Sequence, residues 1–399
     1  MFTKTKVIKS FNRDLFLLMG EMFFRRLVMG FLEVVRTIYL FLVGFDPFQI
    51  GLILTISTII SALDSLILGN LSDRYGRKPF ILLGSITSTF RLVLYALSHE
   101  FWVIVIAQGI GAVGEGVGAG QPIVSGYIAD KVEIKDYPRV FSTLAISNAL
   151  SVTIGSLMAF LPAYFQVSLN LEEINSYILL FWIGAVLNSI AIVFSLKIED
   201  TTIKRIKDKN APPTNISWRE IGKFCIIRST DGLGIGLVMQ LLPLYFFLRF
   251  GASSEDLAIF YALARLLSIP SYFFAPILGN KLGNVKCLII SRMLTGVIIG
   301  TFAMASSFPI SIALFVTYRL LFEFAMPMRQ AFSAGIVEPH KTGTLVGIGN
   351  STRAFLQSLA PTIAGYLFEL GSLSLPLFSG AILLTLNAIQ YHMFYKNEE

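Results

Sequence analysis

The sequence contains little charge and few reactive side chains. Only 14% of its 399 residues are charged, whereas soluble domains carry about 25%. The two cysteines, Cys225 and Cys287, lie far apart and fit neither a disulfide framework nor a metal site. The three histidines show no pairing with a nucleophile and no metal-ligand spacing. We therefore expect a membrane protein with no covalent catalysis, no bound metal and no cofactor.

What the sequence does contain is long apolar segments. Hydrophobic residues make up 54% of the chain, and its mean hydropathy is +0.70. A membrane-spanning helix needs about 20 consecutive apolar residues. We predict twelve spans, at residues 18–43, 48–70, 79–98, 101–128, 140–165, 174–196, 222–248, 256–279, 285–305, 308–333, 343–368 and 373–395.

One long polar connection divides these spans equally. Residues 197–221 are charged and contain two prolines, and six spans lie on each side of them. We predict an N-terminal six-helix bundle at 1–196, a cytoplasmic linker at 197–221 and a C-terminal six-helix bundle at 222–399.

The loop charges predict the orientation in the membrane. Lys and Arg concentrate in the N-terminus and in every second loop, whereas the alternate loops carry acids and only one base, Arg249. Cytoplasmic loops are rich in Lys and Arg, so both termini are predicted to be cytoplasmic. Glu21 and the Arg25-Arg26 pair interrupt the first apolar patch, so we expect no cleaved signal peptide.

An internal repeat supports the division into halves. The sequence GNLSDRYGRKPFILLGS at 69–85 has a weaker counterpart, GNKLGNVKCLIISRM, at 279–293. Asn148 and Asn350, 202 residues apart, each follow a basic loop residue by nine positions. Two parallel halves related by an axis along the membrane normal recur among transporters.

The loop between the second and third spans carries the most specific motif. It matches every fixed position of G-x-x-x-D-R/K-x-G-R-R/K with Gly69, Asp73, Arg74, Gly76, Arg77 and Lys78. In this loop, and across essentially the whole chain, the sequence resembles the major facilitator superfamily. The resemblance implies an all-α membrane protein of twelve transmembrane helices in two pseudo-symmetric six-helix bundles.

The resemblance also implies that this loop is a conformational latch. Asp73 would face the N-terminus of the eleventh helix near residues 342–344, where unpaired backbone N–H groups attract an anion. Arg77 would pair with an acid at the end of the fourth span, for which Asp130 is the candidate. The glycines would allow a tight turn and close backbone approach. A loop that merely sets topology explains the bases but neither Asp73 nor the glycines.

Two departures from the family pattern concern its drug/proton antiporters. In the fourth span, Val105 stands where those proteins have an arginine three residues before Gln-Gly. The fifth span lacks a Gly-Pro pair at 148–160. Both differences argue against that subgroup without excluding export. A G-x-G-x-x-G sequence at 109–114 lies within a predicted span, where its glycines favour close helix packing over nucleotide binding.

Ionisable residues within the spans are the candidate site residues. An ionised side chain at mid-bilayer costs about 2.5–3.5 kcal/mol, so such residues usually face protein or water. The deepest are Glu33, Arg91, Glu115, Arg265, Arg319 and Glu323; Asp64, Arg228, Asp231, Arg292 and Arg353 lie nearer the cytoplasm, and Arg36 nearer the outside.

The resemblance places the first, fourth, seventh and tenth helices around a central cavity, which singles out Glu33, Glu115, Asp231 and Arg319. A carboxylate in a poorly hydrated cavity takes up a proton more readily than one in water, so Glu33 or Glu115 would carry a coupling proton. Arg319 or Arg265 would bind a substrate anion with a bidentate fork.

The alternative for these residues is a set of buried ion pairs. Helical spacing permits Glu33 to pair with Arg36 and Arg319 to pair with Glu323. In the eleventh span, Asn350, Arg353 and Gln357 share one face. We interpret them, with Asp64, as a polar gate or as support for the substrate site, with simple packing as the alternative.

These features predict a secondary active transporter in the cell membrane. It would move a small organic solute by alternating access, with a proton, or alternatively Na+, as coupling ion. We expect a monomer whose partners are the solute, the ion and membrane lipids, and no nucleic acid. A multidrug or metabolite efflux antiporter is one alternative. A transporter-like sensor that binds a solute without moving it is another, although the short linker and tails argue against it.

Overall fold

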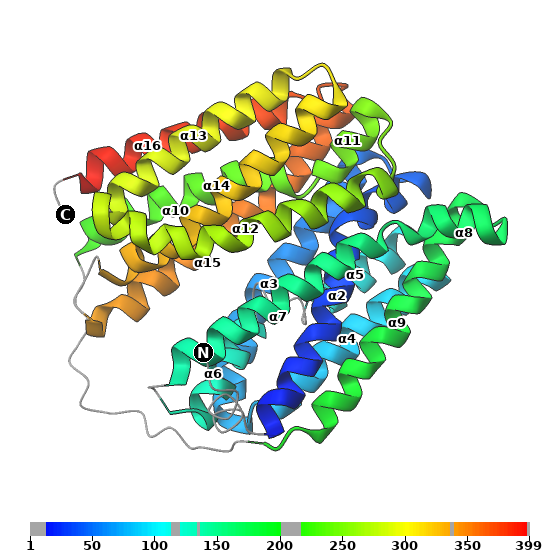
Figure 1. The fold of residues 1–399 in the computed structure, drawn as a ribbon, viewed down its shortest axis with the longest axis horizontal. Helices are drawn as coiled ribbons and strands as arrows, with labels where there is room; N and C mark the ends of the chain where they lie inside the picture. The colour runs from blue at the N-terminus through cyan, green and yellow to red at the C-terminus, as the bar shows by residue number, and fades with distance from the viewer. Residues whose placement is uncertain (1–12, 113–119, 134–135, 201–216, 336–338, 397–399) are drawn as a thin grey trace, which may run out of the picture. The chain divides into compact units, whose positions relative to one another are not determined.

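The computed structural model describes residues 13–112, 120–133, 136–200, 217–335 and 339–396. These residues form helices joined by turns and contain no strand (Figure 1). In its described residues, each of the twelve predicted spans coincides with one helix or with two consecutive helices. In the same part of the chain, eight segments are long and apolar enough to cross a membrane. The all-α fold, with helices at all twelve predicted positions, is confirmed, and the cytoplasmic location of the termini stays a prediction.

The chain divides into two compact units. The first contains residues 1–43, 56–207 and 254–262, and the second contains 44–55, 208–253 and 263–399. Two helices, α3 (Pro47–Tyr75) and α12 (Ser254–Leu282), contribute residues to both units. The predicted boundary at the 197–221 linker stays a prediction.

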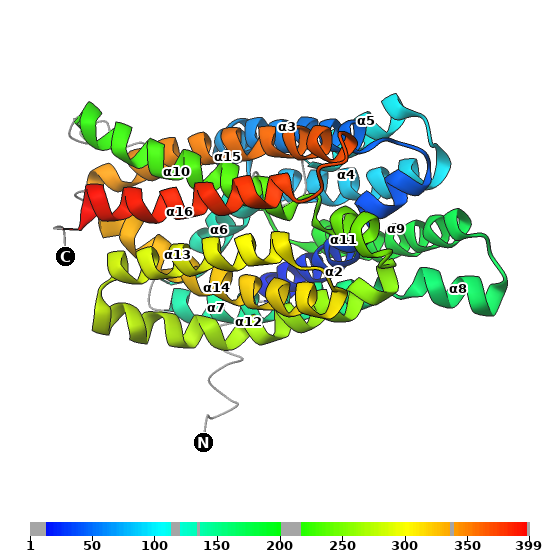
Figure 2. The same cartoon turned by 90° about the horizontal axis from the view of Figure 1, so that it is seen from above.

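The first unit contains α2 (Arg13–Leu42), α4 (Lys78–Leu97), α5 (Phe101–Ala112), α6 (Gly120–Lys131), α7 (Tyr137–Met158), α8 (Leu161–Leu169) and α9 (Glu173–Lys197). In this unit, α2 packs on α7 and α9, and α4 packs on α5 and α9. Figure 2 shows α8 and α9 side by side, and these helices are in contact. A side chain at Gly30 of α2 would overlap the carbonyl of Val152 in α7, so the two backbones touch there.

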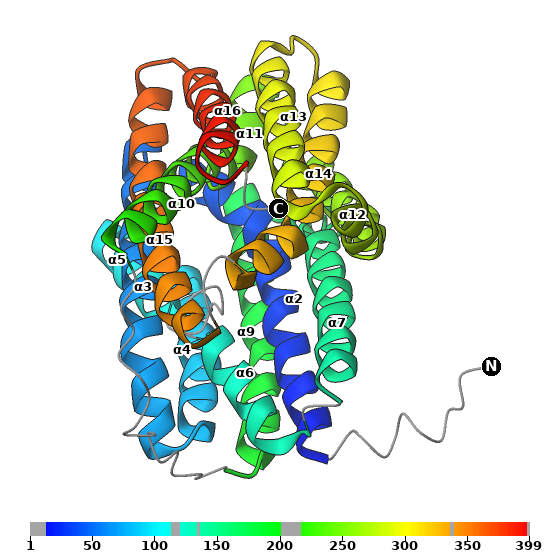
Figure 3. The ribbon, with the colours of Figure 1, turned by 90° about the vertical axis from the view of Figure 1, so that its left-hand side faces the viewer.

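In the second unit, α10 (Trp218–Met239) packs on α15 (Pro339–Glu369) and α16 (Leu375–Tyr395) (Figure 3). In the same unit, α13 (Asn284–Met304) packs on α14 (Phe308–Gly335) and α16. A side chain at Gly232 of α10 would overlap the carbonyl of Arg353 in α15. The short helix α11 (Leu242–Phe250) also lies in this unit.

Local sequence signals explain where several helices begin and end. Asp46 and Gln49 form a reciprocal capping box before α3, with hydrogen bonds of 2.7 and 3.2 Å. Prolines follow the breaks between α7 and α8 and between α10 and α11. A proline cannot donate an interior helix hydrogen bond, so each fits the first turn of a new helix. Gly251 ends α11 with a left-handed φ of 66°.

Candidate functional site

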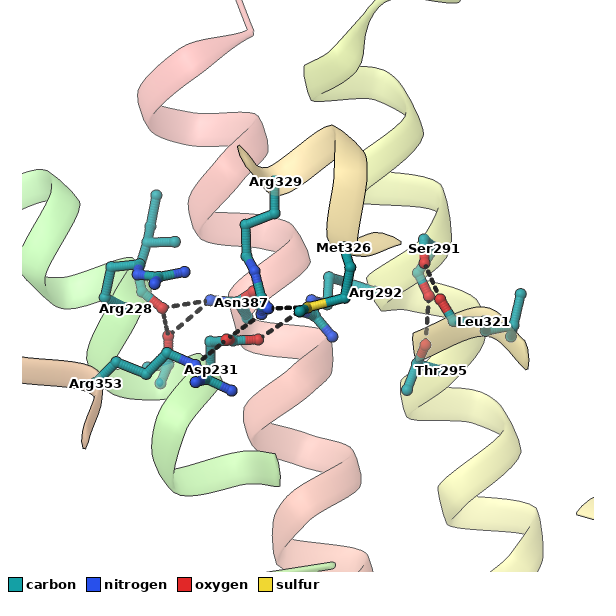
Figure 4. A network of polar contacts seen from close by, with 12 residues as sticks. Arg228, Asp231, Ser291, Arg292, Thr295, Leu321, Met326, Arg329, Arg353 and Asn387 are labelled. Carbon is teal, nitrogen blue, oxygen red and sulfur yellow. Dashed lines mark hydrogen bonds and ion pairs between the residues drawn. The ribbon is translucent and has the colours of Figure 1, made fainter. Parts of the chain in front are cut away.

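The most highly charged buried site in the described residues surrounds Asp231 of α10. Its side chain is 2% exposed and receives three arginines from three other helices. Arg292 Nη2 lies 2.7 Å from Asp231 Oδ1, whereas Arg329 Nη1 and Arg353 Nε each lie 2.9 Å from Oδ2. Figure 4 shows these side chains reaching toward Asp231. We call Asp231, these three arginines and Arg228 the Asp231 cluster.

Close packing of α10 against α15 builds one side of this cluster. Gly232 fits against the Arg353 backbone, and Gly236 fits against the Gln357 carbonyl. The absence of side chains at both glycines lets the helices approach closely. The backbone of Arg353 therefore lies beside Gly232, next to Asp231, and the Arg353 Nε reaches the Asp231 carboxylate.

The predicted polar face of α15 turns out to lie against α10. Asn350 accepts a hydrogen bond from Arg228 Nη2, and Arg353 pairs with Asp231. Gln357 contributes its backbone carbonyl to the packing at Gly236. The three residues are thus brought to one helix interface, and their role as a gate stays a prediction.

Arg329 is a member of the Asp231 cluster that sequence reasoning missed. It lies in α14 within the predicted tenth span, six residues after Glu323. The signal was available, because Arg329 is an ionisable residue inside a predicted span. Arg292 and Arg228 are among the intramembrane bases identified from the sequence, which indicates no partner for either of them.

A second buried ion-pair group joins α12 and α14. Glu323 lies 3.6 Å from Arg319 on its own helix and 3.5 Å from Arg265 on α12. Arg319 is almost fully buried and also contacts Met239 Sδ at 3.7 Å. The pairing of Arg319 with Glu323 is the arrangement that the ion-pair alternative predicts. It engages both arginines that we considered for substrate binding.

In the first unit, the described candidates lie on α2 and α4. Glu33 and Arg36 are both half-buried on α2 and close enough to interact electrostatically. Arg91 of α4 is completely buried, and its side chain lies where a side chain at Gly111 would be. The lack of a side chain at Gly111 of α5 thus makes room for the Arg91 side chain. Glu115 lies outside the described residues.

Sequence reasoning also missed a buried carboxylate on α2. Glu21 is fully buried, lies 3.2 Å from Arg25 Nε and accepts a 2.8 Å hydrogen bond from Ser85 Oγ. In the sequence, Glu21 and Arg25 were interpreted only as charges that interrupt the first apolar patch and argue against a cleaved signal peptide. Their one-turn spacing within an apolar run was the signal for an internal ion pair.

The charged loop after α3 contains Arg77, which forms the predicted ion pair with Asp130 of α6. Arg77 Nε donates to Asp130 Oδ2 at 2.7 Å, and its guanidinium group lies over Gly126 of α6. Gly76 has a φ of 92°, the conformation that the predicted tight turn requires. The Asp200 carboxylate, which sequence reasoning did not include, fills the space beside Gly76.

Of the other residues in this motif, the structure describes the side chains of Arg74 and Lys78. Lys78 Nζ donates to the Leu196 carbonyl at 2.8 Å, and Arg74 is exposed. The surroundings of Gly69 and the side chains of Asp73 and of residues 341–344 lie outside the described part. The predicted contact of Asp73 with the eleventh helix therefore stays a prediction. Asp64 is half-buried, and its Oδ2 has no hydrogen-bond partner among the described residues.

Comparison with known proteins gives consistent matches. The family model described as Major Facilitator Superfamily matches residues 15–361 and 224–399. The quinolone resistance protein NorA of Staphylococcus aureus (strain MRSA252) is 24% identical, with 90% of each chain covered. A crystal structure of a nucleoside transporter NupG mutant superposes with a TM-score of 0.78 at 14% identity, covering 96% of this chain and 99% of that one. The D-xylose-proton symporter gives a TM-score of 0.73 at 13% identity and covers 96% of both chains.

Proposed function

Because the chain belongs to the major facilitator superfamily, we propose that it is a secondary active transporter that moves a small organic solute across the cell membrane by alternating access. The observation that carries this proposal is the family match, which extends over both halves of the chain. Ionisable side chains buried in membrane-spanning helices of both units support it, because such residues usually mark transport pathways. We propose a monomer as the working unit.

We further propose that a proton drives this transport. Glu33 supports the proposal, because it is a half-buried carboxylate on α2, the first of the predicted spans. Such a group can take up and release a proton as its hydration changes. Glu115 is the second candidate, and Na+ is the alternative ion. The D-xylose-proton symporter, which has the same fold, is named for its own proton coupling.

The test uses purified protein in liposomes. A thermal-shift screen of metabolites and drugs at two pH values first supplies a solute, because a ligand that binds the folded state raises the unfolding temperature. Glu33→Gln and Glu115→Gln are then compared with wild type and with Glu369→Gln, a change at an exposed position. We expect the variant at the coupling site to lose proton-driven accumulation and to keep solute counterflow. Full accumulation in both Glu33→Gln and Glu115→Gln would refute these assignments.

Efflux is the second candidate function, and the similarity to a protein named for quinolone resistance favours it, because export of a drug is one route to resistance. Val105 and the missing Gly-Pro pair argue against the antiporter subgroup. Transport measured in inside-out and right-side-out vesicles separates the two directions. A sensor would bind the same solute and show no counterflow at all.

We also propose that the Arg77–Asp130 pair belongs to a latch that favours one state of the transport cycle. The 2.7 Å contact and the buried arginine support this role. The pair joins the end of α6 to the loop before α4. If the two segments move apart, the ion pair breaks; if they stay together, they move as one.

A further inference from the structure

The Asp231 cluster carries more positive than negative charge. Three guanidinium groups contact the single carboxylate of Asp231. A fourth, on Arg228, lies one turn away on the same helix and interacts electrostatically with Asp231. Among the residues that the structure describes, Asp231 is the one carboxylate that pairs with these arginines.

This imbalance is buried. Arg228, Arg292 and Arg329 are 7%, 1% and 7% exposed, and Asp231 is 1% exposed. A buried charge is strongly unfavourable unless an opposite charge and hydrogen bonds compensate it. One carboxylate cannot neutralise four guanidinium groups, so the cluster favours the entry of a further anion.

The cluster also offers hydrogen-bond donors in addition to positive charge. The Nε and Nη1 groups of both Arg228 and Arg292 are buried and have no acceptor among the described residues. Guanidinium groups bind carboxylate and phosphate oxygens through paired, charge-assisted hydrogen bonds. Arg353 is 18% exposed and Asn350 is exposed, so one side of the cluster is accessible.

We propose that the Asp231 cluster binds a small oxyanion, a carboxylate or a phosphate, through Arg228 and Arg292, and that the transported solute carries this group. The bound oxyanion would supply the missing negative charge. Its oxygens would accept hydrogen bonds from the buried Nε and Nη1 groups of Arg228 and Arg292. The assignment to the solute rests on the proposed transport function, whereas the anion site itself does not.

The site is tested first by binding. Thermal unfolding of the purified full-length protein is measured against inorganic phosphate, with chloride at matched ionic strength as the reference. We expect a saturable rise in unfolding temperature that is specific to phosphate, because a ligand of the folded state stabilises it by mass action.

Arg228→Gln is the informative variant, because it removes one guanidinium group and leaves the three ion pairs of Asp231 intact. It should bind phosphate about tenfold more weakly or worse, the effect of one lost charge-assisted hydrogen bond. Arg249→Gln, at an exposed position of α11, is the matched control and should bind as wild type does. Absence of a phosphate-specific shift in wild type, or equal affinity in Arg228→Gln, would overturn the site.

Counterflow then tests the source of the oxyanion. Organic carboxylates and phosphate esters are compared with neutral solutes, and each is also tested for competition with phosphate. Exchange of an anionic solute that competes with phosphate supports the whole proposal. Exchange restricted to neutral solutes that do not compete overturns the assignment to the solute. Phosphate binding without exchange of any solute overturns the proposed transport function and leaves the anion site standing.

Discussion

Replacing Asp231 by Asn isolates the energetic role of the carboxylate in the Asp231 cluster. Asn has nearly the same shape as Asp, so packing around α10 is retained while the negative charge is lost. Three guanidinium groups at 2.7–2.9 Å would then lack their counter-charge. Each of them is at least four-fifths buried, so water cannot fully replace the carboxylate.

The expected magnitude follows from what one broken buried pair costs. Removing one partner of a buried ion pair destabilises a protein by about 3–5 kcal/mol. For a unit of this size, 1 kcal/mol corresponds to about 2–4 °C in unfolding temperature. Asp231→Asn should therefore unfold about 6–20 °C below wild type.

The assay is thermal unfolding of the purified protein without added oxyanion. Adding Arg292→Gln to Asp231→Asn removes one of the uncompensated charges and should recover part of the loss, which a double-mutant cycle measures. Glu369→Gln, at an exposed position, should unfold as wild type does. A decrease for Asp231→Asn smaller than about 2 °C would refute the view that its charge stabilises the second unit.

Two further predictions concern the loop before α4. Gly76→Ala should lower stability by about 1–2 kcal/mol, because its φ of 92° is strained for any side chain and the Asp200 carboxylate occupies the space. Gly222→Ala, in open space on α10, is the control in the same unfolding assay, and equal effects of both would contradict the argument. Asp130→Asn should change cysteine-labelling accessibility of the transport pathway as Arg77→Gln does; unchanged labelling in both would count against the latch.

The sequence predicted the helices well because their signal is local. Membrane-spanning helices must satisfy their backbone hydrogen bonds internally, so a long apolar run indicates a helix without knowledge of its neighbours. The breaks at Pro162 and Pro243 were present in the sequence but lay within long apolar runs. We therefore predicted single spans there, and the structure has consecutive helices.

The candidate site was less predictable because charge partners come from distant segments. The Arg319–Glu323 pair lies within one helix and could be predicted from its spacing. Arg292 and Arg329 meet Asp231 from other helices, and no spacing in the sequence reports that meeting. The Arg77–Asp130 pair could be predicted only from the resemblance to a known family.

The contact between α10 and α15 has a counterpart in the first unit. Gly232 lies 202 residues after Gly30, the same separation that relates Asn148 to Asn350. Each of these two glycines fits against a backbone carbonyl of a neighbouring helix, Val152 in α7 for Gly30. One close helix contact of the first half thus has a counterpart in the second, with the contacted carbonyl shifted by one residue relative to the glycines.

The charges are not repeated in the same way. At the same separation, Asp231 corresponds to Met29 and Arg353 to Ser151, whereas Arg228 corresponds to Arg26. If one ancestral half was duplicated, both copies kept the close glycine contact. The Asp231–Arg353 pair is found in the second copy only. The two halves of the chain can therefore share a mechanical design while differing in the ligands for which each is suited.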